Sequence, residues 1–339
     1  MSLNHAQTEA VAHNKGPCMV LAGPGSGKTL TIAKRIEYLI MKHKVRPEEI
    51  LVITFTKYAA WEMKNRTRSI CGPSSYAVTF GTFHGIYYGI LKWAYRLNQS
   101  NLLSDEEKYR ILREILPGID WDQEPEADEE KDYLQELAIE IGNVKNNCMD
   151  IEEYEPVKYT TEKFRKLYRT YEETKKKYRK IDFEDMLIQC RDLFMKRPDI
   201  LKKWQEKFQY ILVDEFQDVN QAQYDVVRML AAPQDNLFVV GDDDQSVYGF
   251  RGAKPGIMKE FMKDYPKARQ ILLDVNYRSS GYIVKGALRV IGNNKIRFEK
   301  KIEAFRKPDE TVHVQEVKDP VQEAEYVLER IREYREKGV

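Results

Sequence analysis

Several features are missing from this sequence. No apolar run approaches the roughly 20 residues that a membrane-spanning helix needs, and the start "MSLNHAQTEA" has no signal-peptide core. Neither sign of charge dominates, because 55 Lys and Arg face 54 Asp and Glu. The overall charge therefore argues neither for nor against a nucleic-acid partner, and any basic face must be local. The sequence predicts a cytoplasmic protein with no membrane partner.

Cysteine is also scarce. The four cysteines lie far apart, without a CxxC pair, which argues against a zinc or cluster site and predicts reduced, structural thiols. Internal repeats and low-complexity tracts are absent. A length of 339 residues with 42% hydrophobic residues is enough for two or three domains with cores of their own.

Short apolar runs alternate with amphipathic helices over much of the chain. A helix is predicted at 29–43, because Ile32, Ile36, Leu39 and Ile40 fall on one face. Strands separated by helices imply parallel βαβ units, so the fold class is α/β with a doubly wound parallel sheet. The predicted strands are 18–22, 50–55, 77–80, 210–214, 237–242 and 269–273.

Two regions depart from this alternation. Residues from about 98 to 180 are rich in Glu, Lys and Tyr, and the stretches 124–147 and 160–190 look like long charged helices. After Asp274 the pattern predicts a helix near 279–292, a strand at 311–317 and a helix at 321–338, which cannot close an α/β core by themselves. We therefore expect a chain that stops inside a domain. The predicted division is a sheet domain in two parts (1–98 and 182–274), an all-helical insertion (99–181) and an incomplete last domain (275–339).

The stretch "GPGSGKT" follows one predicted strand and opens a helix, as a P-loop requires. Backbone amides of such a loop and the helix N-terminus bind phosphate oxygens. Lys28 would neutralise the β- and γ-phosphates, and the Thr29 hydroxyl would bind Mg²⁺. A glycine-rich turn without a ligand is the alternative. The residues predicted to surround the nucleotide here are Gly23, Pro24, Gly25, Ser26, Gly27, Lys28, Thr29 and Leu30.

A second strand, in "YILVDEFQDVN" (210–220), ends in carboxylates. They could decorate the surface or hold a metal, since ligands of open α/β sheets gather at the carboxyl ends of strands. The P-loop favours the metal, because it needs an acidic strand end. Asp214 then suits Mg²⁺ and Glu215 suits the general base. A nuclease would need further acidic ligands, which the sequence does not offer.

Eight blocks then follow one another in a familiar order. They are "LNHAQ", "AGPGSGKT", "VITFTKYAAWEMKNR", "GTFHGIYYGIL", "DFEDML", "VDEFQDVNQAQ", "VVGDDDQSVYGFRGA" and "LDVNYRSS", between positions 3 and 280. In this order the chain resembles the N-terminal half of a UvrD/Rep/PcrA-like superfamily 1 DNA helicase. The resemblance implies a RecA-like P-loop NTPase sheet (domain 1A), an inserted all-helical domain (1B) and a truncated second RecA-like domain (the start of 2A).

The resemblance also implies roles at the ATP site. Gln7 would hydrogen-bond adenine, and Tyr277 would pack against it. Gln245 would lie near the γ-phosphate, and Arg251 would add charge there. Arg278 would act as an arginine finger, although a surface salt bridge is the ordinary role of such a residue. The implied catalytic set is Lys28, Asp214, Glu215, Gln245 and Arg278, with Thr29 and Asp214 on Mg²⁺.

For DNA, the resemblance implies that the segments "TFT" (54–56) and "GTFH" (81–84) hold the phosphates and bases of a single strand. Stacking on aromatic rings tolerates any sequence, which suits a motor that walks on DNA. Core packing is the alternative for Phe55, Phe83 and Phe250, and a structural histidine is the alternative for His84. The implied DNA contacts are Thr54, Phe55, Thr56, Thr82, Phe83, His84, Tyr248 and Phe250.

Some positions depart from the family. Leu30 stands where an arginine is common, so one nucleotide contact is missing, and Pro24 stands where alanine is frequent. Gly249-Phe250 replaces an Arg-Trp pair. Nothing after "NYRSS" resembles the later helicase motifs, so we expect a fragment of a longer protein.

The expected function is an ATP-dependent DNA helicase or translocase, moving 3′ to 5′, with this chain weakly active or inactive alone. Single-stranded DNA and single-strand/duplex junctions are the expected partners of a monomer, together with repair or replication proteins. The motor half of a helicase–nuclease and a non-catalytic DNA-binding fragment remain alternatives, and an RNA motor is a lesser one.

Overall fold

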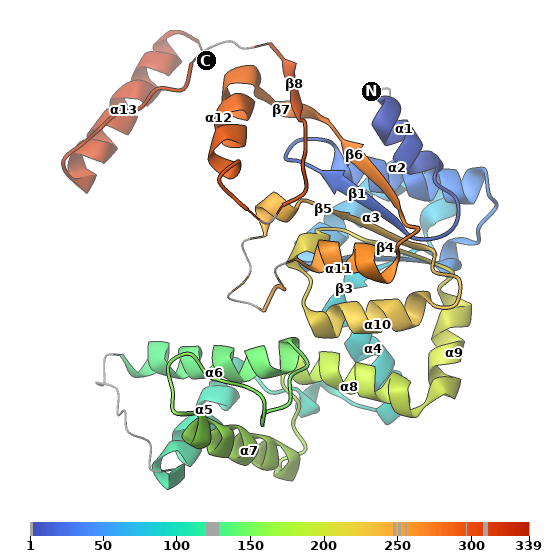
Figure 1. Ribbon diagram of the computed structural model, residues 1–339, viewed down its shortest axis with the longest axis vertical. Coiled ribbons are helices and arrows are strands. Elements are labelled where there is room, and N and C mark those ends of the chain that lie inside the picture. Colours follow the sequence, from blue (N-terminus) through green and yellow to red (C-terminus); the bar gives the residue numbers. More distant parts are fainter. Residues whose placement is uncertain are drawn as a thin grey trace.

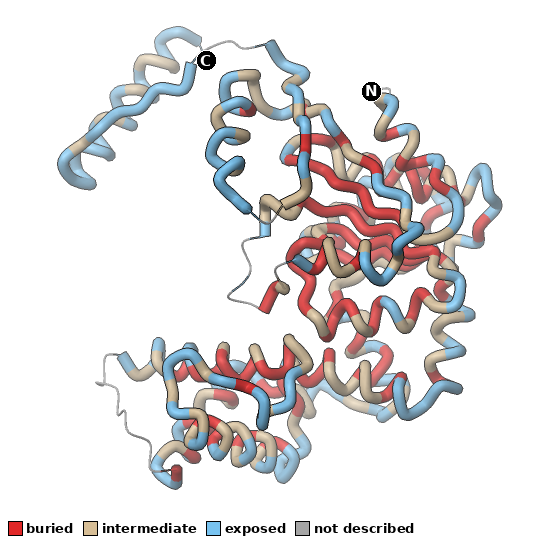
Figure 2. The backbone as a smooth tube through the Cα atoms, viewed as in Figure 1, coloured by how far each residue is buried: buried red, intermediate tan, exposed pale blue. Residues whose placement is uncertain are grey.

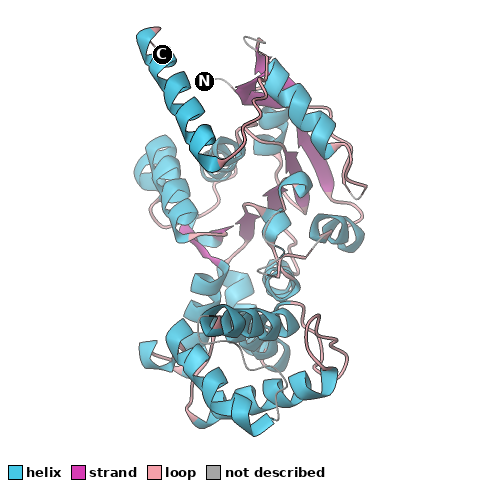
Figure 3. Cartoon of the chain, turned by 90° about the vertical axis from the view of Figure 1, so that its left-hand side faces the viewer, coloured by secondary structure: helices cyan, strands magenta, loops and turns pink. Residues whose placement is uncertain are grey.

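The computed structural model describes residues 3–119, 129–246, 249, 252–254, 256–295, 297–307 and 311–338. Within these ranges no helix is both long and apolar enough to cross a membrane. Figure 1 shows two bodies, a layered α/β part and a separate group of helices. Figure 3 shows the same separation from the side, with the strands confined to the α/β part.

A six-stranded parallel sheet of order β3-β2-β4-β5-β1-β6 forms the centre of the α/β part. Every residue of β1, β2, β4 and β5 is buried, as expected for strands covered on both faces. Figure 2 shows this sheet as a continuous buried layer. The doubly wound α/β fold is therefore confirmed. The strands are β1 (Cys18–Ala22), β2 (Ile50–Thr54), β3 (Thr79–Thr82), β4 (Tyr210–Val213), β5 (Leu237–Gly241) and β6 (Arg269–Leu273).

Helices cover both faces of the sheet. One apolar core, with Ile32, Ile36 and Met63, joins the sheet to α1 (His5–Ala12), α2 (Lys28–Met41) and α3 (Lys57–Cys71). The core of the other face includes Tyr87 and Phe261. It joins the sheet to α4 (Phe83–Tyr95), α8 (Phe183–Lys196), α9 (Pro198–Lys207), α10 (Gln221–Ala231) and α11 (Ile257–Asp264).

The separate helical group consists of α5 (Asp105–Ile115), α6 (Glu130–Asn146) and α7 (Thr161–Lys177), which share a core of their own. Two buried lysines tie it to α8. The Lys145 and Lys175 ammonium groups lie 2.8 and 2.7 Å from Oδ2 of Asp182, and both also contact Asp185. Because all four side chains are at least nine-tenths buried, this cluster holds the helical group on the sheet part.

The last part of the chain, from Val275 onward, forms a small unit around a sheet of its own, and this is the second unit, next to the α/β part with its six-stranded sheet. It contains β7 (Val275–Ser280), α12 (Gly281–Ile291), β8 (Glu303–Arg306) and α13 (Pro320–Glu336), and β7 pairs with β8 in parallel. The predicted strand at 311–317 is wrong. Val312 and Val314 are exposed there, so the apolar side of the alternation is not buried, and 311–317 pairs with none of the described strands, whereas β8 pairs with β7.

Two other boundaries differ from the predictions. The third strand is 79–82, not 77–80, because the Val78 amide closes a turn on the Ser75 carbonyl at 3.1 Å. The predicted helix at 160–190 is two helices. It breaks where Ile181 pairs with the backbone near Leu103 and Asp182 caps α8 by binding the Asp185 amide. The fourfold domain division stays a prediction.

Candidate active site

The P-loop joins β1 to α2 at the carboxyl end of the sheet. Gly25 and Gly27 adopt φ values of +66° and +86°, a region that side chains with a Cβ rarely enter. A Cβ on Gly27 would lie 2.7 Å from the Gln7 amide nitrogen. The sequence thus bends tightly before α2, which leaves the first amides of α2 without partners inside the helix and suited to bind an anion.

Neighbouring polar groups fix the loop's shape. Ser26 Oγ donates to the Gly23 carbonyl at 2.7 Å, and the Gln7 side-chain nitrogen donates to the Ser26 carbonyl at 2.9 Å. Gln7 Oε1 accepts from the Asn4 amide at 3.0 Å in the capping box of α1. Both ends of the buried Gln7 amide are thus bound to protein groups, and its contact with adenine stays a prediction.

Lys28 faces the acidic end of β4. Its Nζ lies 2.7 Å from Oε2 of Glu215, and the two side chains are 13% and 37% exposed. Glu215 has a φ of 51°, a conformation that is uncommon for residues with a Cβ. The predicted phosphate-binding cation and the predicted general base therefore meet at one point.

Asp214 is suited to a divalent cation. Burial, and then the Glu215 charge, raise the pKa of Asp214 to about 7, although Lys28 acts in the opposite direction. A buried carboxylate that is poorly compensated is stabilised by a nearby metal charge. Thr29 lies half-buried in the first turn of α2, and its hydroxyl and Asp214 offer the oxygen ligands that Mg²⁺ prefers.

The loop after β5 brings Gln245 to the same region. Gln245 Nε2 donates to Asp242 Oδ2 at 2.6 Å, and the Asp242 amide donates to Gln217 Oε1 at 3.0 Å. Gln217 in turn donates to Glu215 Oε2 at 3.0 Å. Gln245 is thereby connected to the acidic pair, whereas Arg251 lies outside the described residues.

The β7 strand lies against the P-loop. The Tyr277 amide donates to the Gly25 carbonyl at 2.9 Å, and its hydroxyl accepts from the Asn4 amide group at 3.0 Å. A Cβ on Gly25 would lie 2.5 Å from Cβ of Arg278. Asn276 fixes this turn by accepting from the Arg278 amide. The Cβ atom of the exposed Arg278 therefore lies beside the P-loop, and its role as an arginine finger stays a prediction.

The predicted DNA residues at 54–56 and 82–84 lie where two neighbouring strands end. Thr54 and Thr82 are partners in the register of β2 and β3. Thr82 caps α4 by accepting from the Gly85 amide at 3.1 Å, and Thr56 caps α3 in the same way through Ala59. The two segments are therefore brought together at the carboxyl edge of the sheet.

A hollow of about 430 Å³ adjoins these segments, between the sheet part and the helical group. Phe55, Phe83 and His84 line it together with Phe183, whose ring lies 5.7 Å from that of His84. Phe83 is only 2% exposed and packs in the core, as the alternative interpretation held. Burial lowers the pKa of His84, so the ring is neutral near pH 7. The two predicted aromatic contacts at positions 248 and 250 lie outside the described residues.

Sequence reasoning missed several residues of these sites. Gln217 and Phe183 lie inside the quoted blocks "VDEFQDVNQAQ" and "DFEDML", which could have suggested them. Asn146 and Lys108 line the hollow from the helical group. No local sequence pattern predicts that these two side chains lie near the sheet part. Lys300 contacts the acidic residues after β5, a pairing that spans more than fifty positions.

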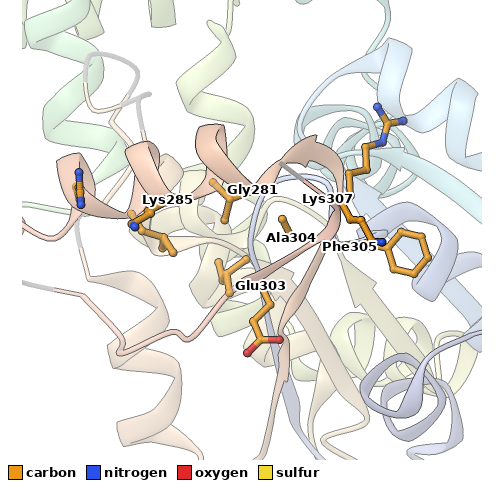
Figure 4. A pocket seen from close by; sticks show the side chains of 11 residues that line it. Gly281, Lys285, Glu303, Ala304, Phe305 and Lys307 are labelled. Atoms are coloured by element: carbon orange, nitrogen blue, oxygen red, sulfur yellow. The ribbon is translucent and has the colours of Figure 1, made fainter. Parts of the chain in front are cut away.

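A second hollow, of about 630 Å³, lies between α12 and β8 (Figure 4). The labelled side chains of Lys285, Phe305 and Lys307 border it at different ends, and Val284 and Leu288 add apolar surface. These side chains form no cluster of catalytic or metal-binding type. We therefore assign no chemistry to this hollow.

A glycine-rich loop that wraps a helix N-terminus, opposite an acidic strand end in a parallel sheet, defines a P-loop NTPase of the RecA-like type. Comparison with known families narrows this class. Residues 3–266 match the UvrD/REP helicase N-terminal domain, and the chain belongs to that family. The resemblance found in the motifs is confirmed.

Individual relatives agree. YjcD of Bacillus subtilis is 39% identical over 349 residues, which cover 100% of this chain and 44% of YjcD. The ATP-dependent DNA helicase PcrA of Staphylococcus aureus is 35% identical, over 99% of this chain and 46% of PcrA. DNA helicase II of Escherichia coli is 34% identical, over 99% and 47%. The chain thus spans about half the length of the curated relatives it matches.

Proposed function

We propose that this chain forms the P-loop side of an ATP-driven motor that moves on single-stranded DNA and separates duplex DNA, 3′ to 5′. One observation carries the proposal. The Lys28 ammonium meets Glu215 at 2.7 Å, on the same sheet edge where Thr54 and Thr82 lie in register. A phosphate site and a candidate strand-binding site thus share one rigid sheet, as coupling between ATP and DNA requires.

At the ATP site, the P-loop amides and Lys28 bind the phosphates. Thr29 and Asp214 hold Mg²⁺, which neutralises charge on the β- and γ-phosphates when bound. Glu215 accepts a proton from the attacking water. Arg278 approaches from the β7 side, where the turn after Asn276 carries it. Positioning and charge stabilisation supply most of the catalysis of phosphoryl transfer.

At the DNA site, the threonine-capped starts of α3 and α4 bind strand phosphates through the backbone amides of their first turns and the hydrogens of the threonine hydroxyls. The hollow beside them offers Phe55, His84 and Phe183 as faces on which bases stack. Stacking of this kind is sequence-tolerant and contributes about 1–3 kcal/mol per base. Gln217 Nε2 donates to Glu215 Oε2 at the ATP site and to Oδ2 of Asp218, which lines the hollow, and this shared donor provides a physical connection by which bound nucleotide and bound DNA influence each other.

The test is steady-state ATP hydrolysis by this chain with and without mixed-sequence single-stranded DNA, beside Lys28→Ala and His84→Ala. We expect DNA to raise turnover in the parent. Lys28→Ala should abolish turnover but retain DNA binding. His84→Ala should weaken DNA binding by about tenfold, the size of one lost stacking contact. DNA binding without any Lys28-dependent turnover would instead favour the non-catalytic DNA-binding module.

A further inference from the structure

Lys300 contacts three consecutive carboxylates across the boundary between the two units. It lies between α12 and β8, and its side chain is fully buried. Its Nζ lies 2.5 Å from Asp242, 2.5 Å from Asp243 and 2.7 Å from Asp244, all in the loop after β5. Burial opposes the positive charge, but hydrogen bonds to the three carboxylates raise the pKa of Lys300. The ammonium therefore stays charged, and holds together three anions that would otherwise repel one another.

This contact continues into the ATP site without a break. Asp242 Oδ1 binds Lys300, while its Oδ2 binds Gln245 at 2.6 Å. The Asp242 amide donates to Gln217 Oε1 at 3.0 Å, and Gln217 Nε2 donates to Glu215 Oε2 at 3.0 Å. That same Glu215 oxygen accepts from Lys28 at 2.7 Å. Four hydrogen bonds thus link the second unit to the P-loop cation.

The Gln217 side chain can pass a displacement of Asp242 on to Glu215, because its own conformation is restricted. Its side chain is buried, and its two amide ends have different partners, so a flip would break both hydrogen bonds. A Cβ on Gly241 would lie 2.7 Å from Gln217 Oε1, so the backbone also encloses the amide. A displacement of Asp242 must therefore move Gln217, and with it the carboxylate of Glu215.

We propose that Lys300 is a positioning residue for ATP hydrolysis, which fixes Glu215 through Asp242 and Gln217. The inference rests on the proposed function. It adds that the orientation of the Glu215 carboxylate depends on the contact between the second unit and the loop after β5. Lys300 also orients Gln245, because both side chains share the Asp242 carboxylate. It contacts neither the P-loop nor the acidic pair.

The test compares Lys300→Met with Arg297→Met in steady-state ATP hydrolysis. Arg297 is the matched control, because it binds only Asp244 in the same contact, at 2.9 and 2.7 Å. We expect Lys300→Met to lower kcat by about tenfold or more while KM and Mg·ATP affinity change by less than about threefold. Arg297→Met should leave both close to the parent. A Lys28-dependent turnover that is equal in the parent and Lys300→Met would overturn this inference alone, whereas Mg·ATP binding that is absent from the parent, or unchanged in Lys28→Ala, would overturn the proposed function.

A second measurement does not depend on turnover. The side-chain amide protons of Gln217 should give an NMR signal with slow solvent exchange in the parent and in Arg297→Met, and exchange about tenfold faster or more in Lys300→Met. Unchanged exchange in Lys300→Met would contradict the proposal. Should Lys300→Met fail to fold, Gln217→Glu replaces it. That variant keeps the shape but removes the donor to Glu215, and unchanged kcat would overturn the relay.

Discussion

The Lys28 ammonium and the Glu215 carboxylate lie 2.7 Å apart, although the two residues are separated by most of the sheet domain's sequence. The same Glu215 oxygen accepts a hydrogen bond from Gln217. Phosphates bound at the P-loop compete for this ammonium, because they attract it more strongly than one carboxylate does. We therefore expect nucleotide binding to free Glu215 for its proposed role as a base, while Gln217 keeps the carboxylate in place.

Glu215→Gln should separate binding from hydrolysis. The amide retains the shape of the side chain and one oxygen that can accept from Lys28 and Gln217, but it cannot accept the proton of the attacking water. We expect ATP turnover to fall by about 10²–10⁴-fold while the affinity for Mg·ATP stays within a few-fold of the parent. Turnover by phosphate release and binding by calorimetry check this, and equal turnover in the two proteins would exclude Glu215 as the base.

Asp214 should make the stability of the Mg²⁺-free protein fall with rising pH. Its pKa is raised to about 7 in the folded protein, from an ordinary value of 3.8, so the folded state binds the proton more tightly. The contribution of protonated Asp214 to the free energy of unfolding is complete below pH 4 and is lost as the pH rises towards 7. Asp214→Asn cannot ionise, so its melting temperature relative to the parent should increase between pH 5 and pH 8. A difference that is constant over this range would contradict the raised pKa.

Gly25→Ala tests the packing of the second unit on the P-loop. Gly25 has a φ of +66°, and an added Cβ would approach Arg278 Cβ to 2.5 Å. Gly16→Ala is the matched control, since Gly16 has a φ of +85° with nothing within 4 Å of the added Cβ. Both variants should lose about 1 kcal/mol of stability through the backbone conformation. Only Gly25→Ala should also weaken Mg·ATP binding by about tenfold, because the phosphate cradle and the arginine turn must move apart. Equal nucleotide affinity in the two variants would refute this packing.

Lys175→Met should destabilise the fold by about 3–5 kcal/mol, because it leaves the buried Asp182 and Asp185 with too little positive charge. Urea unfolding measures the change. Asp199→Asn is the control. It removes a well-formed ion pair with Arg197 in which both side chains are 58% exposed, so stability should barely change. Similar losses in the two variants would contradict the structural role of the cluster.

The sheet and the P-loop were predictable because their signals are local. Each signal lies within a short stretch of sequence: an apolar run predicts a strand, a glycine-rich turn predicts the P-loop, and a helical period predicts α2. The β2–β3 threonines were predicted from the family resemblance of their segments alone, since neither one ends a predicted strand. The strand at 311–317 failed for the opposite reason: alternation does not say which segment finds a partner, and Glu303–Arg306 took the place beside β7.

Long-range pairings were beyond sequence reasoning. Lys300 and Arg297 have no local pattern that distinguishes them from other surface cations, yet they bind carboxylates more than fifty positions away. The pair of buried lysines at Lys145 and Lys175 reads as part of a charged helix, although both are under 5% exposed. In each case burial depends on which helices meet in three dimensions.

Every proposed role of the ATP site depends on Mg·ATP binding at the P-loop through Lys28. Calorimetric titration of the parent, Lys28→Ala and Lys34→Ala with Mg·ATP tests it most directly. Lys34 lies on the same helix and pairs with Glu37 at the surface, which makes it the matched control. We predict one saturable site in the parent and in Lys34→Ala, and affinity at least about tenfold lower in Lys28→Ala. Equal binding by the parent and Lys28→Ala would contradict this role of the P-loop lysine.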